Sequence, residues 1–543
     1  MLKTKQKQKQ QGTVSDPQPL SLKERLAQRR KAERLRKELV TFTTFAVFFS
    51  AIIGFLLGLA SGPKLGLGAA MGVLCTSLSF KYPRQALWAF LIYMPFSGTI
   101  TYTLGNSPLL QLAKDGFYIP ALIGVIQYCR REKLPIIVSK QLVAPLALLL
   151  ALCMLTMLLV NMSQQFAADG DEQPLFMGIL GLKVLIGYVP LIVCAYYLLR
   201  DRNDLLFLMR LTVILILVCC GLCFMQYLLL KTGRCEGTRF AEGAAQFKAA
   251  LDARCFVGGS VLYSPQHGQI RLPGTFVAPW QWGWFLISAG FLAFATAFND
   301  PKAHWRTLGL TSLAAVFIMA VLSGQRVALA LVPFTFVLLL LLTGQVANLK
   351  RFIPTAFGLL LLLGVAALQN PDVLQQRLDS FESRWNASPP HQFIVDQFQW
   401  VTRSSELLGR GLGRATNSAR TLGETALIET YYPKLIYEVG PFGALAFLLV
   451  VTVLVYVTFK AYRGLRDRGL RNLGASLWVF VLFISYNTYY YPLDVDPVAV
   501  YYWFFAGVIL RLPDIERAER LEASRKDQPV STKRRRLKRS GFA

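Results

Sequence analysis

The sequence lacks the common motifs of soluble enzyme sites: it contains no HExxH, no P-loop, no GxSxG and no protein-kinase set. Their absence argues against a zinc protease, a P-loop nucleotide hydrolase, an α/β-hydrolase and a kinase. No segment repeats with a period of about 20–50 residues, which excludes a solenoid or a repeat array. Only one of the three histidines, His391, lies in the second of two long polar segments, and a single histidine does not form a metal site by itself.

The nine cysteines also supply few candidate ligands. Cys220 and Cys223 form a CxxC pair, but the pair lies inside an apolar run, where the polar surroundings and further ligands of a zinc site are missing. Cys235 and Cys255 share a polar segment that is predicted to lie outside the cytoplasm, where an oxidising compartment permits a disulfide. The sequence leaves open whether they pair. No metal and no other cofactor is predicted.

What the chain has in excess is apolar residues, which make up 54% of it. They occur in runs of about 15–24 residues, separated by short basic clusters. An α-helix needs about 20 apolar residues to cross the hydrocarbon core of a bilayer. The pattern predicts an all-α, polytopic transmembrane helical bundle of about 14 spans. The predicted spans lie near 39–60, 66–80, 85–104, 116–129, 141–161, 178–199, 206–230, 278–298, 308–323, 327–345, 352–369, 436–459, 474–490 and 497–511.

The formal charge of +27 is not distributed as in a nucleic-acid-binding protein. Much of the excess lies near the two chain ends and in short clusters between apolar runs, and Lys and Arg concentrate in the cytoplasmic loops of membrane proteins. If both termini are cytoplasmic, every strongly basic short connection falls on the cytoplasmic side. The sequence therefore predicts a multi-pass protein of the bacterial inner membrane, in contact with membrane lipids and without a nucleic-acid partner.

This topology divides the chain into a basic segment, 1–38, a bundle, 39–511, and a basic tail, 512–543. Within the bundle two long segments, 231–277 and 370–435, fall outside the cytoplasm. Segments of such length between spans are usually functional or disordered. The second mixes aromatic with polar residues, which predicts short helices at the membrane interface, and a purely structural lid is the alternative. No cleavable signal peptide is apparent, so the first span is expected to act as an uncleaved insertion signal.

Two arginines stand at predicted outer mouths of helices. Arg326 ends the segment 323–326 (SGQR) between two apolar runs, where a charge is costly and is a functional candidate by default. The alternative is an arginine that only anchors the hairpin at the interface. Arg271 opens the segment 271–276 (RLPGTF) before a helix entrance rich in tryptophan. It either belongs to that interfacial aromatic belt or faces the same cavity as Arg326.

The second long segment contains the other candidates. Arg410 and Arg414 lie in a glycine-rich turn, 409–414 (GRGLGR), whose flexible backbone and guanidinium groups suit phosphate oxygens. Glu429, just before the next span, is a candidate general base, with a solvated loop carboxylate as the alternative. His391 is a second candidate base, although a role at the loop surface is favoured.

A DxD pair, Asp494 and Asp496, lies between the last two predicted spans. Some glycosyltransferases hold a divalent ion with such a pair. Beside Pro492 and Pro497 the two carboxylates are interpreted instead as part of a tight polar turn.

Four of these segments together resemble the O-antigen ligase/polymerase superfamily of integral membrane proteins, over about residues 265–450. Proteins of this kind occur in cyanobacterial and other exopolysaccharide clusters, including the hormogonium type, and the residues do not assign the subgroup. Segment 271–276 is similar to the pattern Arg-x-x-Gly-x-Phe, and segment 323–326 is similar to Ser-x-Ser-Arg, with Gln325 replacing the second serine. Segment 408–413 is similar to a loop Gly-x-Gly, and segment 429–443 is similar to the loop end that leads into Gly-x-x-Gly.

The chain departs from the family pattern at one position, because Glu429 stands where the ligases carry their catalytic histidine. This favours a polymerase-like member over a ligase that acts on lipid A core. The resemblance implies metal-independent glycosyl transfer at the outer face of the inner membrane. The donor would be a polyprenyl-pyrophosphate-linked oligosaccharide and the acceptor another glycan, with other polysaccharide-assembly proteins as possible partners.

In the implied reaction Arg326 and Arg271 neutralise the diphosphate leaving group. Arg410 and Arg414 assist from the loop. The acceptor hydroxyl loses its proton to Glu429, or alternatively to His391.

The competing function is a membrane transporter or a flippase of lipid-linked glycans. Such a protein places charges near the bilayer midplane on broken helices. Lys183 is the main charge inside a predicted span, whereas the long segments hold many charges, and this favours chemistry at the outer face. A scaffold of a synthase complex is a third possibility, and it would lack a cavity with converging arginines.

Overall fold

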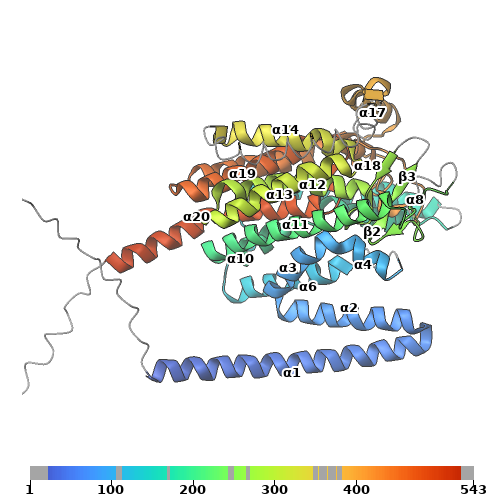
Figure 1. Cartoon of the computed structure of the whole chain (residues 1–543). Coiled ribbons are helices and arrows are strands. Elements are labelled where there is room, and N and C mark those ends of the chain that lie inside the picture. Colours follow the sequence, from blue (N-terminus) through green and yellow to red (C-terminus); the bar gives the residue numbers. More distant parts are fainter. Residues whose placement is uncertain are drawn as a thin grey trace, which may run out of the picture. The chain divides into compact units, whose positions relative to one another are not determined.

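The computed structural model describes residues 22–105, 113–167, 171–241, 250–264, 269–346 and 385–527, with a few single positions between 353 and 383. These residues form α-helices almost throughout (Figure 1), which confirms the all-α prediction. Among them nine helices are long and apolar enough to cross a membrane, and two shorter apolar helices accompany them. This composition supports a membrane protein but does not confirm the predicted count of about 14 spans. The predicted span 352–369 lies almost entirely outside the described residues.

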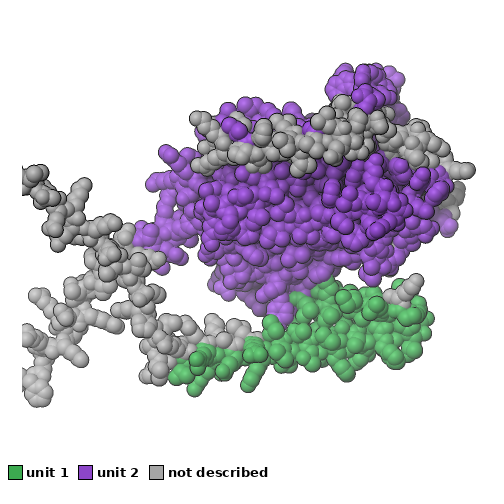
Figure 2. Space-filling view, viewed as in Figure 1, with its two compact units in different colours: residues 1–78 green, residues 79–543 purple. Residues whose placement is uncertain are grey.

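The chain divides into two units, residues 1–78 and 79–543, which Figure 2 shows in different colours. In the first, α1 (Leu22–Ser61) packs against α2 (Pro63–Lys81) through glycines. A Cβ atom at Gly66 would lie 2.4 Å from the carbonyl oxygen of Gly54. Such close approach of small residues is typical of helix pairs in membranes. α1 runs unbroken past residue 38, where the sequence analysis placed the end of the basic segment.

The second unit is a helical bundle around α12, which is 89% buried over its most apolar stretch. α12 packs against α11, α13, α14 and α19. α20 likewise continues past residue 511, the predicted end of the bundle. The helices of this unit are α3 (Pro83–Tyr93), α4 (Ser97–Thr103), α6 (Ala113–Arg131), α7 (Val143–Thr156), α8 (Met162–Ala167), α9 (Pro174–Ile186), α10 (Leu191–Leu198), α11 (Arg202–Lys231), α12 (Pro279–Asn299), α13 (Ala303–Leu322), α14 (Arg326–Leu342), α17 (Pro390–Ser404), α18 (Tyr431–Arg463), α19 (Arg468–Tyr486) and α20 (Val498–Asp527).

One end of this bundle, here called the basic end, collects the Lys- and Arg-rich connections that the sequence analysis assigned to the cytoplasm. Ion pairs join those connections across the end. The end includes the C-terminal half of α20, at the far left of the bundle in Figure 1. The pairs are Arg84–Asp204 at 2.7 Å, Arg202–Glu519 at 2.8 Å and Arg210–Asp300 at 2.8 Å.

The opposite end, here called the loop end, contains α17, α4, α8 and four short strands (Figure 1). The strands lie in the predicted polar segment 231–277 and were not anticipated from sequence. They form two antiparallel pairs, β1 (Arg254–Cys255) with β2 (Val257–Ser260) and β3 (Leu262–Ser264) with β4 (Gln269–Arg271).

The cysteines behave according to their environment. Cys235 and Cys255 form a disulfide at the loop end, which settles the pairing that the sequence left open. Cys220 and Cys223 are unpaired and buried within α11, where they pack as small core residues.

Candidate functional site

Arg271 and Arg326, which the sequence analysis predicted to share a site, lie on backbone segments that are hydrogen-bonded to each other. The N–H group of Leu272 donates to the carbonyl oxygen of Ser323 at 3.0 Å. Arg271 precedes Leu272 directly at the end of β4, and Arg326 is the first residue of α14. Both arginine side chains are half-buried. The structure therefore brings the two predicted segments together at the loop end; they are called the arginine junction below.

The arginine junction is tightly packed, and this packing explains why a glycine occupies position 274. Gly274 has a φ of 55°, and a Cβ atom there would lie 2.4 Å from the ring of Trp282. Only glycine combines this left-handed backbone with such a close contact. On its other side the segment is held by the N–H group of Thr99 in α4, which donates to the carbonyl oxygen of Thr275 at 3.0 Å.

Four buried polar atoms around the junction have no hydrogen-bond partner among the described residues. They are Thr275 Oγ1, Trp282 Nε1, Ser323 Oγ and Gln325 Nε2. Gln325 lies against α12, because a Cβ atom added at Gly283 of α12 would lie 3.3 Å from the Cβ atom of Gln325. A buried donor without an acceptor costs about 1–3 kcal/mol. The junction therefore combines two arginines with buried polar groups that no described residue satisfies.

A turn of three tyrosines connects this junction to the second long segment. Trp284 of α12 donates its indole N–H to the carbonyl oxygen of Tyr490 at 3.1 Å. Phe393 of α17 packs its ring against Tyr489 and Tyr490, with centroids 6.0 and 6.5 Å apart. The sequence analysis did not single out this turn, because no motif marks it.

The tyrosine turn also has an unusual backbone. Tyr490 and Tyr491 have φ values of 55° and 37°, in the left-handed region that costs a bulky residue about 1–3 kcal/mol. Such strain persists only where the surroundings determine the conformation, and it is concentrated at functional sites. The turn therefore belongs to the candidate site.

Glu429 lies between α17 and the tyrosine turn. Its N–H group donates to Gln397 Oε1 of α17 at 3.3 Å, and the next residue, Thr430, forms an isolated β-bridge with Tyr489. Burial raises the pKa of Tyr491 to about 12, opposed by a hydrogen bond with Asn417 and assisted by the carboxylate of Glu429.

His391, the alternative proton acceptor, is the second residue of α17 and is exposed. α17 itself confirms the expectation of a short helix in the second polar segment. Its apolar side packs onto the loop end, where Val401 is fully buried beside Ala415 and Ile428. Its polar side, which includes His391, faces outward.

Two backbone N–H groups of the glycine-rich turn 409–414 form hydrogen bonds with α18. Pro441 of α18 has no N–H group for the carbonyl oxygen of Tyr437, four residues earlier, so this oxygen lacks its helical partner. The N–H group of Arg410 takes that place at 2.6 Å, and the N–H group of Gly411 donates to the carbonyl oxygen of Glu438 at 3.2 Å. These amides are therefore not directed at an anion, as the sequence interpretation required.

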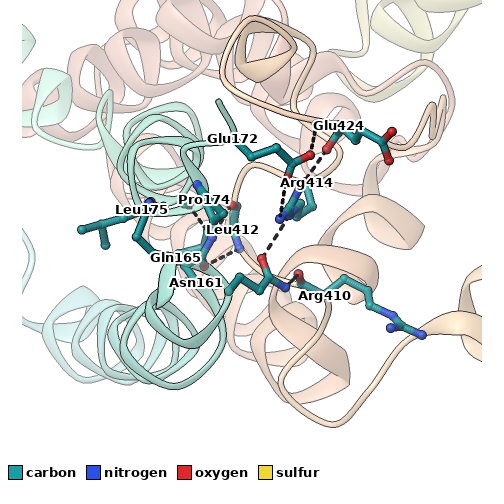
Figure 3. A network of polar contacts seen from close by, with 10 residues as sticks. Asn161, Gln165, Glu172, Pro174, Leu175, Arg410, Leu412, Arg414 and Glu424 are labelled. Atoms are coloured by element: carbon teal, nitrogen blue, oxygen red, sulfur yellow. Dashed lines mark hydrogen bonds and ion pairs between the residues drawn. The ribbon is translucent and has the colours of Figure 1, made fainter. Parts of the chain in front are cut away.

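Arg414 is likewise engaged (Figure 3). Its guanidinium group donates to Gln164 Oε1 at 3.1 Å and to Glu172 Oε2 at 3.3 Å. Arg410 instead forms an exposed ion pair with Glu406 at 3.1 Å. In Figure 3 the side chains of Arg410 and Arg414 point away from each other, so the two do not converge on one ligand.

Glu172 ties this network to the loop. The N–H group of Glu424 donates to its carboxylate at 3.1 Å. This hydrogen bond, opposed by a smaller effect of burial and assisted by Arg414, lowers the pKa of Glu172.

The DxD pair is part of a tight turn, as the sequence interpretation expected, and both carboxylates are engaged by lysines. Asp494 pairs with Lys434 of α18, and Asp496 pairs with Lys114 of α6. Lys434 and Asp494 are almost fully buried, with 3% and 8% of their side chains exposed. A buried pair of this kind joins α18 to the tyrosine turn. No motif indicated either lysine.

Comparison with known proteins yields no relative: no family model matches the chain, and no curated protein sequence matches it. The function is inferred from the site itself.

Proposed function

We propose that the protein is a metal-independent glycosyltransferase that polymerises or ligates polyprenyl-pyrophosphate-linked oligosaccharides at the outer face of the bacterial inner membrane. The observation that supports this most is the arginine junction. Arg271 and Arg326 lie on hydrogen-bonded segments beside four buried polar groups that have no partner in the described part of the chain. The oxygens of a diphosphate only accept hydrogen bonds, so they suit a site of guanidinium groups and unpaired donors.

The proposed reaction joins two glycans. The acceptor hydroxyl oxygen forms a bond to the anomeric carbon of the donor sugar, and the bond between that carbon and the diphosphate oxygen breaks. The electron pair leaves with the polyprenyl diphosphate, whose added charge Arg271 and Arg326 stabilise. The hydroxyl proton passes to Glu429, with His391 as the alternative. Because the donor is already activated, the reaction requires no nucleotide.

Two independent features support an outer location for the junction. The disulfide Cys235–Cys255 lies at the loop end, and disulfides persist in oxidising compartments. The basic connections lie at the opposite end, and such connections remain in the cytoplasm. Together they orient the loop end outward and the C-terminal end of α20 inward.

Arg326→Ala tests the proposal. Removing a fixed cation from a developing phosphate charge costs about 3 kcal/mol, so we expect polymer synthesis to fall about 10²-fold while the protein still inserts into the membrane. Arg403→Ala is the matched control, because Arg403 is an exposed arginine on α17. Polymer of wild-type length and yield in the Arg326 variant would rule the proposal out.

A transporter or flippase is the second candidate, because one predicted span, 178–199, is broken. α9 and α10 are separated by a turn at 187–190, and Lys183 pairs with Asp115 at 2.9 Å just before it. Broken helices with internal charges are typical of transporters. Flipping of a lipid-linked glycan in reconstituted vesicles, undiminished by Arg326→Ala, would favour this candidate.

A further inference from the structure

Four charged side chains gather inside the bundle at the break between α9 and α10. Lys183 pairs with Asp115 of α6 at 2.9 Å, and the neighbouring Lys114 pairs with Asp496 in the turn before α20. All four are mostly buried, with 12–29% of their side chains exposed. They are called the Lys/Asp cluster. None of them takes part in the proposed chemistry at the arginine junction.

The helix break beside the cluster has a cause in the sequence. Pro190 offers no N–H group to the carbonyl oxygen of Ile186, and the N–H group of Val189 bonds to that oxygen instead, at 3.1 Å. A side chain satisfies a second carbonyl group of the break, because the hydroxyl of Tyr118 donates to Gly187 O at 2.9 Å. The break is therefore a built feature of the bundle.

Tyr188, within the break, lies between the two lysines. The ammonium groups of Lys114 and Lys183 lie 5.9 and 5.4 Å from the centre of its ring, which attracts cations. Tyr188 is only 5% exposed, yet its hydroxyl has no partner among the described residues. The Oδ1 atom of Asp115 is buried and equally unpartnered. An unmet donor and an unmet acceptor thus lie in one cluster.

The charges of the cluster select the class of ligand. Each of the two lysines already pairs with an aspartate, so the cluster offers no unpaired charge to an anion or a cation. No group of three metal-ligating side chains occurs among the described residues. An ammonium group has three N–H donors, and a carboxylate and a phenol both accept hydrogen bonds. This mixture suits adjacent hydroxyl groups, each of which donates and accepts.

We propose that the Lys/Asp cluster, with Tyr188, is a saccharide-binding subsite for an uncharged sugar ring of the glycan substrate. The inference rests on the proposed function, because a sugar is present only if the substrate is a glycan. The subsite is connected to the tyrosine turn, since Asp496 lies two residues after Asp494. It is also close to the second long segment, because a Cβ atom added at Gly181 of α9 would lie 2.4 Å from the backbone nitrogen of Gly413.

Saturation-transfer NMR on the purified full chain in detergent tests the subsite, with the methyl glycosides of glucose, galactose and N-acetylglucosamine as probes. Tyr188→Phe removes only a hydroxyl group, which no residue in the described part of the chain contacts through a hydrogen bond. We expect it to weaken glycoside binding about five- to tenfold while the thermal midpoint stays at or above that of the wild type.

Tyr197→Phe, on α10 and outside the cluster, is the matched control. It leaves the Pro135 carbonyl oxygen without its donor, so it should lower the thermal midpoint and leave glycoside binding unchanged below the transition. Absence of saturation transfer to all three glycosides in the wild type would overturn the subsite. Equal binding by the wild type and Tyr188→Phe would overturn it as well.

Titration with inorganic pyrophosphate separates this proposal from the proposed function. Arg326→Ala should lose pyrophosphate binding, and Tyr188→Phe should keep it. If the wild type binds no pyrophosphate, the diphosphate site fails, whatever the glycosides do. If Tyr188→Phe loses pyrophosphate binding, the cluster is an anion site and the saccharide proposal falls.

Discussion

Arg414 shows at the residue scale why a motif arginine is not always a ligand-binding arginine. Its guanidinium group donates hydrogen bonds to the side chains of Gln164 and Glu172 and to the carbonyl oxygen of Glu424. Binding a phosphate there would require these partners to be replaced. The arginine junction differs in its neighbours, because several buried polar groups there have no partner among the described residues. The number of unmet donors, rather than the number of arginines, distinguishes the two places.

Glu429→Gln should cut polymer turnover about 10²-fold or more, because an amide cannot accept the proton of the acceptor hydroxyl. Pyrophosphate binding should be nearly unchanged. Turnover in isolated membranes and pyrophosphate titration measure the two effects. Glu424→Gln is the control, since Glu424 is an exposed glutamate of the same loop. Unchanged turnover in Glu429→Gln would assign proton transfer to His391 or to another group.

The pKa of Glu172 gives a prediction for acid stability. Its folded-state pKa lies below the ordinary value of 4.5, so the ionised carboxylate stabilises the folded loop above that value. This stabilisation is lost as the pH falls below 4.5 through the lowered pKa. We expect the protection of the Glu424 amide against hydrogen exchange, measured relative to its intrinsic exchange rate, to fall in that range. In Glu172→Gln the exchange should be faster at neutral pH and should lack this acid transition.

At the scale of elements, α18 both forms a candidate span and holds the preceding loop in place, because it is kinked. Gly440 has φ 73° and ψ 175°, which ends the first helical part and begins the second at Pro441. The kink exposes the carbonyl oxygen of Tyr437, and the loop residue Arg410 bonds to it. The buried carboxylate of Glu438 also accepts the N–H group of Ala415 at 2.8 Å. The span and the loop are therefore one packed structure.

Gly440→Ala should destabilise the protein. A left-handed backbone costs a non-glycine residue about 1–3 kcal/mol, and the added Cβ would lie 2.1 Å from the carbonyl oxygen of Leu407. The thermal midpoint of the purified protein measures this. Gly221→Ala is the control, because Gly221 lies within α11 and its Cβ would meet open space. Equal midpoints for the two variants would contradict the role given to the kink.

At the scale of the whole molecule, the second unit has a chemical polarity between its two ends. Ion-paired basic connections form one end, and the disulfide, the strands, α17 and the arginine junction form the other. Positive charge resists translocation and disulfides need an oxidising compartment. Both features favour the same orientation, in which the loop end faces away from the cytoplasm.

Cysteine labelling of whole cells tests this orientation. His391→Cys lies at the exposed start of α17, and Arg525→Cys lies on the exposed last turn of α20. We expect a membrane-impermeant maleimide to label His391→Cys in intact cells and Arg525→Cys only after permeabilisation. The unmodified protein measures the background from native cysteines. The reversed pattern would place the arginine junction in the cytoplasm and remove the proposed function.

Much of the fold was predictable because it depends on composition along the chain. Long apolar runs become helices in a bilayer whatever their neighbours are. The helix α17 was also predictable, since its sequence mixes aromatic with polar residues. The strands at the loop end were not, because strands of two to four residues have no clear periodicity. The broken span at 187–190 reads as continuous by hydropathy alone.

The candidate site was predictable only in part. Arg271 and Arg326 are named by short motifs, and their segments do meet through Leu272 and Ser323. The lysines that pair with the DxD carboxylates have no motif, since Lys114 and Asp496 are 382 residues apart in the chain. The tyrosine turn is likewise defined by its contacts with α12 and α17.

The sequence by itself determined that this is an all-α membrane protein with its basic connections on one side, because hydrophobicity and charge act locally along the chain. Only the tertiary structure decided which charged groups are already neutralised and which polar groups remain unmet. Arg414 and Gln164 come together across 250 residues of chain, as do other partners of the site. Such pairing depends on how helices pack against one another, and no local pattern contains that information.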